Sequence, residues 1–178
     1  RVGSIEKANH ILLEAFAKVR KELYSWSIEL VGNIEPSFIE YINKYYESYP
    51  ELKERVKLIG FLDKRELKDK YKSAKVFCLT SPSEACANVF SQAISNGCYL
   101  ISTDVDGARD ITNNEEFGSI VPVNDIDRLS VVLKDICLNE DLLEKNCIEA
   151  QRYARKNLSW IKLCGEIDKS LICNKEYQ

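Results

Sequence analysis

The sequence predicts an open, doubly wound α/β domain, in which a parallel sheet carries helices on both faces. Short strand-like runs alternate with helical segments along the chain. The strand-like runs are nearly continuous in apolar residues, as in strands that are buried on both faces. The chain has 178 residues, of which 45% are hydrophobic and 30% charged. This length and composition suit a single globular domain over residues 1–178.

The first third of the chain contains a helix, a strand and a second helix. Apolar residues recur at three- and four-residue spacing over residues 8–22, which predicts a helix with one buried stripe. Residues 27–32 alternate between polar and apolar and stop at a glycine, which predicts a strand. Pro36 suits the first turn of the helix that follows, because its fixed φ is already helical.

The alternation continues to the end of the chain. Residues 56–62 read as a strand, and Asp63 with Glu66 three residues later forms the pattern of a capping box at the start of a short basic helix. The remaining predicted elements are a strand over 75–80, a helix over 87–96 that ends at Gly97, strands over 98–102 and 119–123, and helices over 125–138, 141–156 and 159–173.

Charge and hydropathy exclude two classes of partner. Lys and Arg number 25 against 28 Asp and Glu, so the net charge of −3 gives no overall attraction for nucleic acid. No apolar run approaches the roughly 18 residues that span a bilayer, and the N-terminus lacks a signal-peptide core, so we expect a cytoplasmic domain. Methionine is absent, even at position 1, and we therefore expect the chain to be a piece of a longer protein.

Cysteine and histidine usage argues against metal and triad chemistry. The seven cysteines form no CxxC pair and several lie in apolar runs, so they read as reduced, packed thiols. His10 is the single histidine, which makes a histidine-based metal site or a Ser/His/Asp triad improbable.

Ligands of doubly wound sheets bind at the carboxyl ends of the strands. Residues 81–93 place Glu84 at such an end, followed by small residues and a helix start. Small residues there let a phosphate approach the amides of the first helical turn. The alternative is that Ser83 or Glu84 merely caps the helix, and this segment alone does not decide between the two.

The stretch 81–107 resembles the donor-binding signature of retaining GT-B glycosyltransferases of the large family four group. Other segments resemble the same family in the same order, namely Arg1 with Lys7, Leu13 to Phe16, Val56 to Leu62, Gly118 to Val123, and Leu158 to Trp160. The resemblance implies a Rossmann-like domain, the C-terminal half of a GT-B fold. It also implies that an N-terminal acceptor-binding domain and the strand leading into Arg1 lie outside this chain.

The resemblance implies roles for individual residues. Glu84 is the catalytic residue, which accepts hydrogen bonds from hydroxyls of the donor sugar. The expected binding residues are Arg1, Lys7 and the amides of Ala87, Asn88 and Val89 for the donor diphosphate, Gln92 for the ribose, and Gly60 and Phe61 for the border of the nucleobase. Cations at the diphosphate stabilise the charge that the leaving group gains.

The function implied is transfer of a hexose-type sugar from a UDP-, GDP- or ADP-linked donor, without a metal or other cofactor. The acceptor would be a glycan, a capsule or lipopolysaccharide precursor, or a glycolipid of the cell envelope, at the inner face of the membrane. It would be bound by the missing domain, so we expect this fragment alone to be inactive.

Two other functions stay open. A GT-B-fold sugar-nucleotide epimerase would move a proton at the sugar, and a single histidine argues against it. A degenerate, non-catalytic nucleotide-sugar-binding module is motivated by three departures from the family pattern. Gln92 replaces a carboxylate, Ala85 replaces a glycine that can adopt positive φ, and Asp106 stands where glycine is common.

Two further patterns have rival explanations. Asp104 and Asp106 form a DxD pair, which in the other large glycosyltransferase fold binds a divalent cation, but a carboxylate that hydrogen-bonds its own loop is the favoured reading. The basic stretch 64–72 suggests peripheral contact with a membrane, although charges of mixed sign on a short helix more often form a solvated face.

Overall fold

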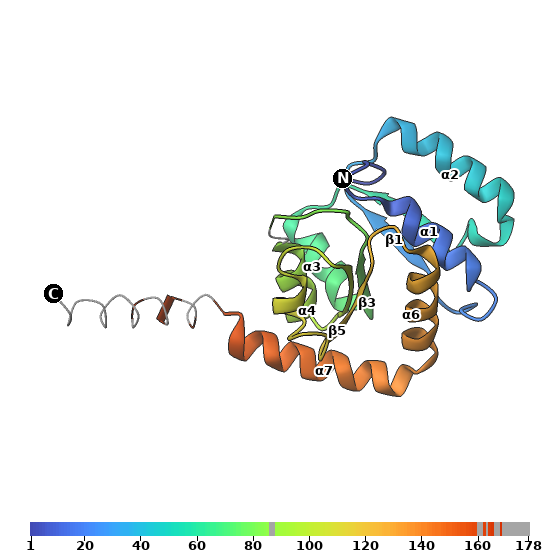
Figure 1. Ribbon diagram of the computed structural model, residues 1–178. Helices are drawn as coiled ribbons and strands as arrows, with labels where there is room; N and C mark the ends of the chain where they lie inside the picture. Colours follow the sequence, from blue (N-terminus) through green and yellow to red (C-terminus); the bar gives the residue numbers. More distant parts are fainter. Residues whose placement is uncertain (86–87, 160–161, 163, 166–167, 169–178) are drawn as a thin grey trace.

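The computed structural model describes residues 1–85, 88–159, 162, 164–165 and 168, in which strands and helices alternate along the chain (Figure 1). The strands are β1 (Ile28–Val31), β2 (Val56–Gly60), β3 (Val76–Leu79), β4 (Tyr99–Thr103) and β5 (Gly118–Val121). The helices are α1 (Asn9–Lys18), α2 (Pro36–Ser48), the 3₁₀ turn η1 (Pro50–Leu52), α3 (Lys64–Ser73), α4 (Asn88–Ser95), α5 (Ala108–Ile111), α6 (Ile126–Leu138) and α7 (Glu140–Asn157).

All described strand pairs are parallel, which confirms the predicted α/β class. The strands form two groups, β1 with β2 and β3-β4-β5, in place of the single predicted sheet. Within the described residues no strand ladder joins the two groups. Val2 pairs with the segment leaving β1 through an isolated parallel bridge to Ile34.

Helices cover both faces of the strands, as predicted. Side chains alternate along β4, so Tyr99 and Ile101 join a large core with α1, α2 and α6, while Leu100 joins a second core with α4 and α5. Helix α7 packs along α4 at the edge of the molecule (Figure 1). The first core also contains residues of β1 and β2, so shared packing holds the two strand groups together.

The first helix is shorter than predicted. It ends at Lys18, although the apolar periodicity continues to Leu23. The Arg55 guanidinium donates hydrogen bonds to the carbonyls of Arg20, Leu23 and Trp26, the first at 3.0 Å and the last at 2.9 Å. The apolar stripe beyond Lys18 is therefore completed by non-helical chain, whose carbonyls bind Arg55.

Other boundaries agree to within a few residues. The capping box at Asp63 is confirmed, because its side chain accepts from two amides and Glu66 accepts from the Asp63 amide. Sequence patterns did not predict α5 or η1, which are too short to show a period. The predicted helix over 159–173 falls largely outside the described residues.

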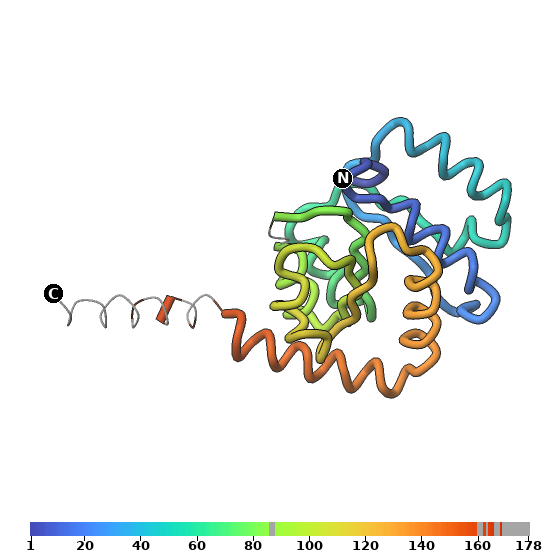
Figure 2. Tube along the Cα trace, in the orientation of Figure 1, coloured from blue at the N-terminus to red at the C-terminus, as the bar shows by residue number. Residues whose placement is uncertain are grey.

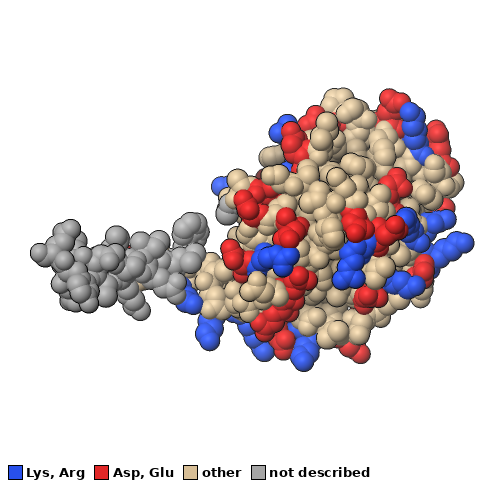
Figure 3. All heavy atoms as spheres, in the orientation of Figure 1, with Lys and Arg blue, Asp and Glu red and all other residues tan. Residues whose placement is uncertain are grey.

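None of the described helices combines the length and the apolar run that crossing a membrane requires. On the face drawn in Figure 3, Lys and Arg are interspersed with Asp and Glu. This agrees with the near-neutral charge balance of the sequence.

Candidate functional site

An ion pair joins two of the sequence-predicted residues at the carboxyl end of β3. Lys7, in the loop before α1, donates a hydrogen bond from Nζ to Oε1 of Glu84, in the loop after β3. The Glu84 side chain is 15% exposed and that of Lys7 is 32% exposed, which makes this the least exposed ion pair in the described part of the chain. The fold thus brings together a cation and a carboxylate that lie 77 positions apart.

Lys7 controls the protonation of Glu84. Burial by itself would raise the pKa of this carboxyl, but the hydrogen bond and charge of Lys7 and the nearby Ser81 hydroxyl outweigh it, so the pKa of Glu84 is lowered. The carboxylate is therefore ionised at neutral pH and acts as an acceptor only.

A buried threonine fixes the backbone of residues 3–8, the segment before α1 that contains Lys7 and is called the lysine loop below. The hydroxyl of Thr80 lies 3.1 Å from the carbonyl oxygen of Lys7 and 3.0 Å from that of Ala8, and donates to them. Ala8 is the N-cap of α1 in the left-handed conformation, with φ of 43°. The lysine loop lies at the same end of the molecule as the loop leaving β3 (Figure 2). Thr80 therefore links these two loops directly.

A second buried hydroxyl, that of Thr103, forms a layer of hydroxyl side chains together with Thr80 and Ser81. Thr103, at the end of β4, donates from Oγ1 to the carbonyl oxygen of Ser81. The Ser81 residue is 0% exposed, and its Oγ has no hydrogen-bond partner among the described residues. The buried Oγ of Ser4, in the lysine loop, is likewise without one.

Helix α4 begins at Asn88, shortly after Glu84 in the sequence. Its first residues are Asn88, which is exposed, and Val89, which is half-buried. The free amides of a first helical turn carry partial positive charge and can bind phosphate. The predicted phosphate ligand Ala87 lies outside the described residues. Ala85 is not among the described residues with positive φ, so the expected cost of losing a glycine there does not arise.

The remaining predicted residues that the structure describes have no ion pair or hydrogen bond with Lys7 or Glu84 through their side chains. Arg1 is 63% exposed at its side chain and lies 3.8 Å from Glu35. Gln92 lies on the exposed face of α4. Gly60 has φ of +84° with open space where a side chain would start, and Phe61 is 74% exposed. Within the described residues no hydrogen bond or ion pair joins the side chains of these residues to Glu84, and their roles remain predictions.

Asp104, the first carboxylate of the DxD pair, forms an ion pair with Arg109 of α5. Asp104 accepts two hydrogen bonds from Arg109, at 2.9 and 2.7 Å, and Arg109 also lies 3.5 Å from Glu115. The pKa of Asp104 is lowered, chiefly by the Arg109 hydrogen bonds. No group of three or more metal-ligating side chains occurs in the described ranges.

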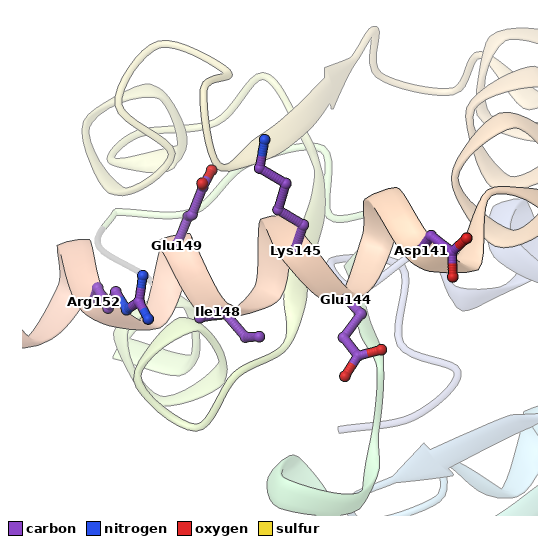
Figure 4. A pocket seen from close by; sticks show the side chains of 6 residues that line it. All are labelled: Asp141, Glu144, Lys145, Ile148, Glu149 and Arg152. Atoms are coloured by element: carbon purple, nitrogen blue, oxygen red, sulfur yellow. The ribbon is translucent and has the colours of Figure 1, made fainter.

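A hollow on α7 has no comparable chemistry. Its six lining side chains all come from this one helix and spread along its surface (Figure 4). They are three acidic, two basic and one apolar side chain, namely Asp141, Glu144, Glu149, Lys145, Arg152 and Ile148. They are ordinary solvated side chains of a surface helix.

Sequence reasoning missed the hydroxyl layer of Thr80, Ser81 and Thr103. A signal was present, because hydroxyl residues end two strand-like runs at 80–81 and 102–103. Neighbouring parallel strands place such ends side by side, and β3 does pair with β4.

Comparison with known proteins identifies the family to which most of the chain corresponds. A model of the family described as "Glycosyl transferases group 1" matches residues 2–156. A curated relative from Campylobacter jejuni, N-acetylgalactosamine-N,N'-diacetylbacillosaminyl-diphospho-undecaprenol 4-alpha-N-acetylgalactosaminyltransferase, is 26% identical over 96% of the chain. Phosphatidyl-myo-inositol mannosyltransferase of Mycobacterium tuberculosis is 22% identical over 94% of the chain. The chain spans 45% and 44% of these two relatives.

Two solved structures share the fold. Anabaena HepE in complex with UDP superposes with a TM-score of 0.79 at 18% identity, over 96% of this chain and 46% of that one. The C-terminal domain of a glycosyl transferase group 1 family protein from Francisella tularensis superposes with a TM-score of 0.74 at 16% identity. That match covers 87% of this chain and 81% of the Francisella domain, so the fold is that of the C-terminal half of such enzymes.

Proposed function

Because the chain belongs to the glycosyl transferases group 1 family, we propose that it binds the nucleotide-sugar donor of a retaining glycosyltransferase. The observation that carries the proposal is the half-buried pair of Lys7 and Glu84 beside the start of α4. A cation next to free helix amides suits a diphosphate, and a fixed carboxylate suits sugar hydroxyls.

In this proposal each group acts on one part of the donor. Lys7, Arg1 and the amides of Ala87, Asn88 and Val89 bind the diphosphate. Glu84 accepts hydrogen bonds from the hexose, Gln92 contacts the ribose, and Gly60 with Phe61 borders the base. The reaction breaks the bond between the anomeric carbon and the diphosphate oxygen, and the acceptor oxygen bonds to the same face of the sugar. The acceptor proton leaves with the diphosphate, whose charge Lys7 stabilises.

The acceptor belongs to the rest of the enzyme. The two curated relatives carry lipid-linked or lipid acceptors in their names, and this chain spans less than half of each. We therefore assign acceptor binding to a separate N-terminal half and place the enzyme in the cytoplasm, at the inner face of a membrane, where it serves cell-envelope polysaccharide or glycolipid synthesis. The isolated chain is expected to bind donor without efficient transfer.

Calorimetric titration with UDP, GDP and ADP tests donor binding. We expect selective binding of one of the three, with a matching rise in apparent stability. Lys7→Met should weaken that binding about tenfold, because it removes a charge-assisted contact to phosphate. Lys18→Met serves as the control, because it removes an exposed lysine at the far end of α1 from its pair with Asp127. Binding of none of the three nucleotides would overturn the proposal.

The proposal includes no metal. Asp104 is already engaged by Arg109 in a bidentate pair, which leaves Asp106 as the only free member of the motif. We expect nucleotide affinity to be the same in EDTA as in millimolar Mg²⁺ or Mn²⁺. A Mg²⁺- or Mn²⁺-dependent gain that Asp106→Asn abolishes would show that the loop binds the cation.

The degenerate-module alternative is favoured by one observation, the uncharged side chain of Gln92 on the exposed face of α4. Gln92→Glu distinguishes the two functions in the nucleotide titration. Unchanged affinity would support a competent site in which an amide suffices for the ribose, whereas a large gain would support a weakened one. The epimerase alternative gains nothing from the structure, since His10 contacts the ring of Tyr41.

A further inference from the structure

Lys7 and Glu84 satisfy each other when no donor is bound. Within the described residues, no second cation forms an ion pair with Glu84. The carboxylate is mostly buried, so water compensates little for the loss of its partner. Lys7 therefore cannot move to another anion without leaving Glu84 a poorly solvated charge.

The lysine can change partner only through its side chain. Thr80 holds the carbonyls of Lys7 and Ala8, so the backbone at this point is fixed. A lysine side chain is a point charge on a flexible four-carbon stem, and its ammonium can swing between neighbouring acceptors. In the proposed donor site Lys7 therefore exchanges Glu84, its observed partner, for a phosphate of the donor.

A bare nucleoside diphosphate and a complete sugar nucleotide affect this ion pair differently. The bare nucleotide binds Lys7 but supplies no hydrogen-bond donor to Glu84, and it adds a negative charge beside the carboxylate that has lost its partner. The sugar nucleotide also takes Lys7, but its sugar hydroxyls donate hydrogen bonds that replace the ammonium at Glu84.

We propose that the Lys7–Glu84 ion pair makes Glu84 a specificity-determining residue that favours the sugar nucleotide over the bare nucleoside diphosphate. This inference rests on the proposed donor site. After transfer, the sugar hydroxyls leave with the product, Glu84 recovers Lys7, and the diphosphate loses its cation. The same pair therefore weakens retention of the spent nucleotide.

The buried Ser81 hydroxyl supports a built acceptor position at Glu84. It lies beside the carboxylate and, together with Lys7, helps to keep the pKa of Glu84 low. One hydroxyl cannot replace an ammonium charge, so the sugar hydroxyls are still required for full compensation.

The test is Glu84→Gln, measured by titration with UDP and UDP-glucose and with GDP and GDP-mannose. The variant keeps the side-chain shape but does not hold Lys7 by charge. We expect the affinity for the bare nucleotide to rise about tenfold, and the affinity for the sugar nucleotide to change by less than about threefold. The preference for the sugar nucleotide over the bare nucleotide then falls by at least about threefold.

Glu6→Gln is the matched control. Glu6 is an exposed carboxylate in the same loop, next to Lys7 in sequence, so its loss changes the local charge without breaking the pair. It should shift both members of each nucleotide pair by the same factor. In the Lys7→Met background, Glu84→Gln should bring no comparable gain for the bare nucleotide, because there is no lysine to release.

The outcomes separate this inference from the proposed function. If Glu84→Gln strengthens bare and sugar nucleotides equally, the effect is general electrostatics and the specificity role is overturned, while the donor site stands. If neither UDP nor GDP, bare or sugar-linked, binds the unaltered chain, the proposed function fails with it. Thermal unfolding of each variant establishes that it is folded, and the comparison of two ligands on one variant cancels any loss of stability.

Discussion

Single hydroxyl groups position the charged side chains of the site. Thr80 lies 2% exposed and bonds two carbonyls of the lysine loop, and Thr103 lies 1% exposed and bonds the carbonyl of Ser81. Buried carbonyls without partners are costly, so these hydroxyls favour one arrangement of the loops. The position of Lys7 opposite Glu84 follows from that arrangement.

Thr80→Val tests whether the Thr80 hydroxyl positions the lysine loop. The variant keeps the side-chain shape but removes the donor shared by the carbonyls of Lys7 and Ala8. We expect a loss of about 1–3 kcal/mol in the free energy of unfolding, measured in urea, and weaker nucleotide binding. Thr80→Ser retains the hydroxyl and should restore nucleotide affinity even where stability is not fully recovered. Unchanged affinity in Thr80→Val would contradict a positioning role.

At the scale of elements, the start of a helix also depends on local hydrogen bonds, as α3 shows. Helix α3 begins at a complete capping box, in which the Asp63 carboxylate accepts from the amides of Arg65 and Glu66 at 2.8 Å each. The helix buries only Tyr71 fully, so its own packing contributes little to its start. We infer that the cap is a major local contribution to the stability of α3.

Asp63→Ala should lower the free energy of unfolding by about 1 kcal/mol, because it leaves two amides of the first turn unsatisfied. The comparison is Asp69→Ala, which removes an exposed carboxylate of the same helix whose partner is Lys72 at 3.3 Å. That change should cost less than about 0.5 kcal/mol. Urea unfolding of the two variants measures the difference, and equal effects would argue against the cap.

Element prediction from the sequence succeeded where local chemistry decides the structure. The cap at Asp63 and the proline at the start of α2 are local signals, and both were read correctly. The predicted end of α1 was wrong, because the apolar periodicity continues past Lys18 into a segment that is not helical and whose carbonyls bind the distant Arg55. The division of the strands into two groups also depends on pairing between distant segments, which periodicity does not reveal.

The whole molecule contains titratable groups that burial keeps neutral. Burial raises the pKa of the Cys98 and Cys137 thiols from an ordinary value of 9.0 to about 12 in each case. Between these values the unfolded chain releases protons that the native chain retains. Stability is therefore fully present below pH 9 and falls as the pH rises toward 12.

Each of these two thiols should lower the free energy of unfolding by about 1.4 kcal/mol between pH 8 and pH 10. Urea unfolding at both pH values, with Cys98→Ala as the comparison, measures the contribution of one thiol. The variant starts less stable because it loses buried volume, but its decrease with pH should be smaller by that amount. An identical decrease in the two proteins would contradict the assignment of a raised pKa to Cys98.

The candidate site was predictable in part. Lys7 and Glu84 were identified separately from the sequence, and their ion pair follows from the meeting of the α1 and β3 loops. That they neutralise each other was not foreseen, because a motif gives residue types and spacing but no side-chain geometry. The hydroxyl layer was missed for the same reason, since Thr80 and Thr103 act through the backbone of other segments.

The central claim is that a donor diphosphate binds between the Lys7 loop and the start of α4. Amide chemical-shift mapping of the ¹⁵N-labelled chain during addition of the preferred nucleotide tests it most directly. The account predicts the largest shifts at Lys7, Ala8, Asn88 and Val89, with little change at Glu144 and Ile148 in the α7 hollow. Shifts confined to α7 would contradict the account, as would saturation by the nucleotide without change at Lys7 or Asn88.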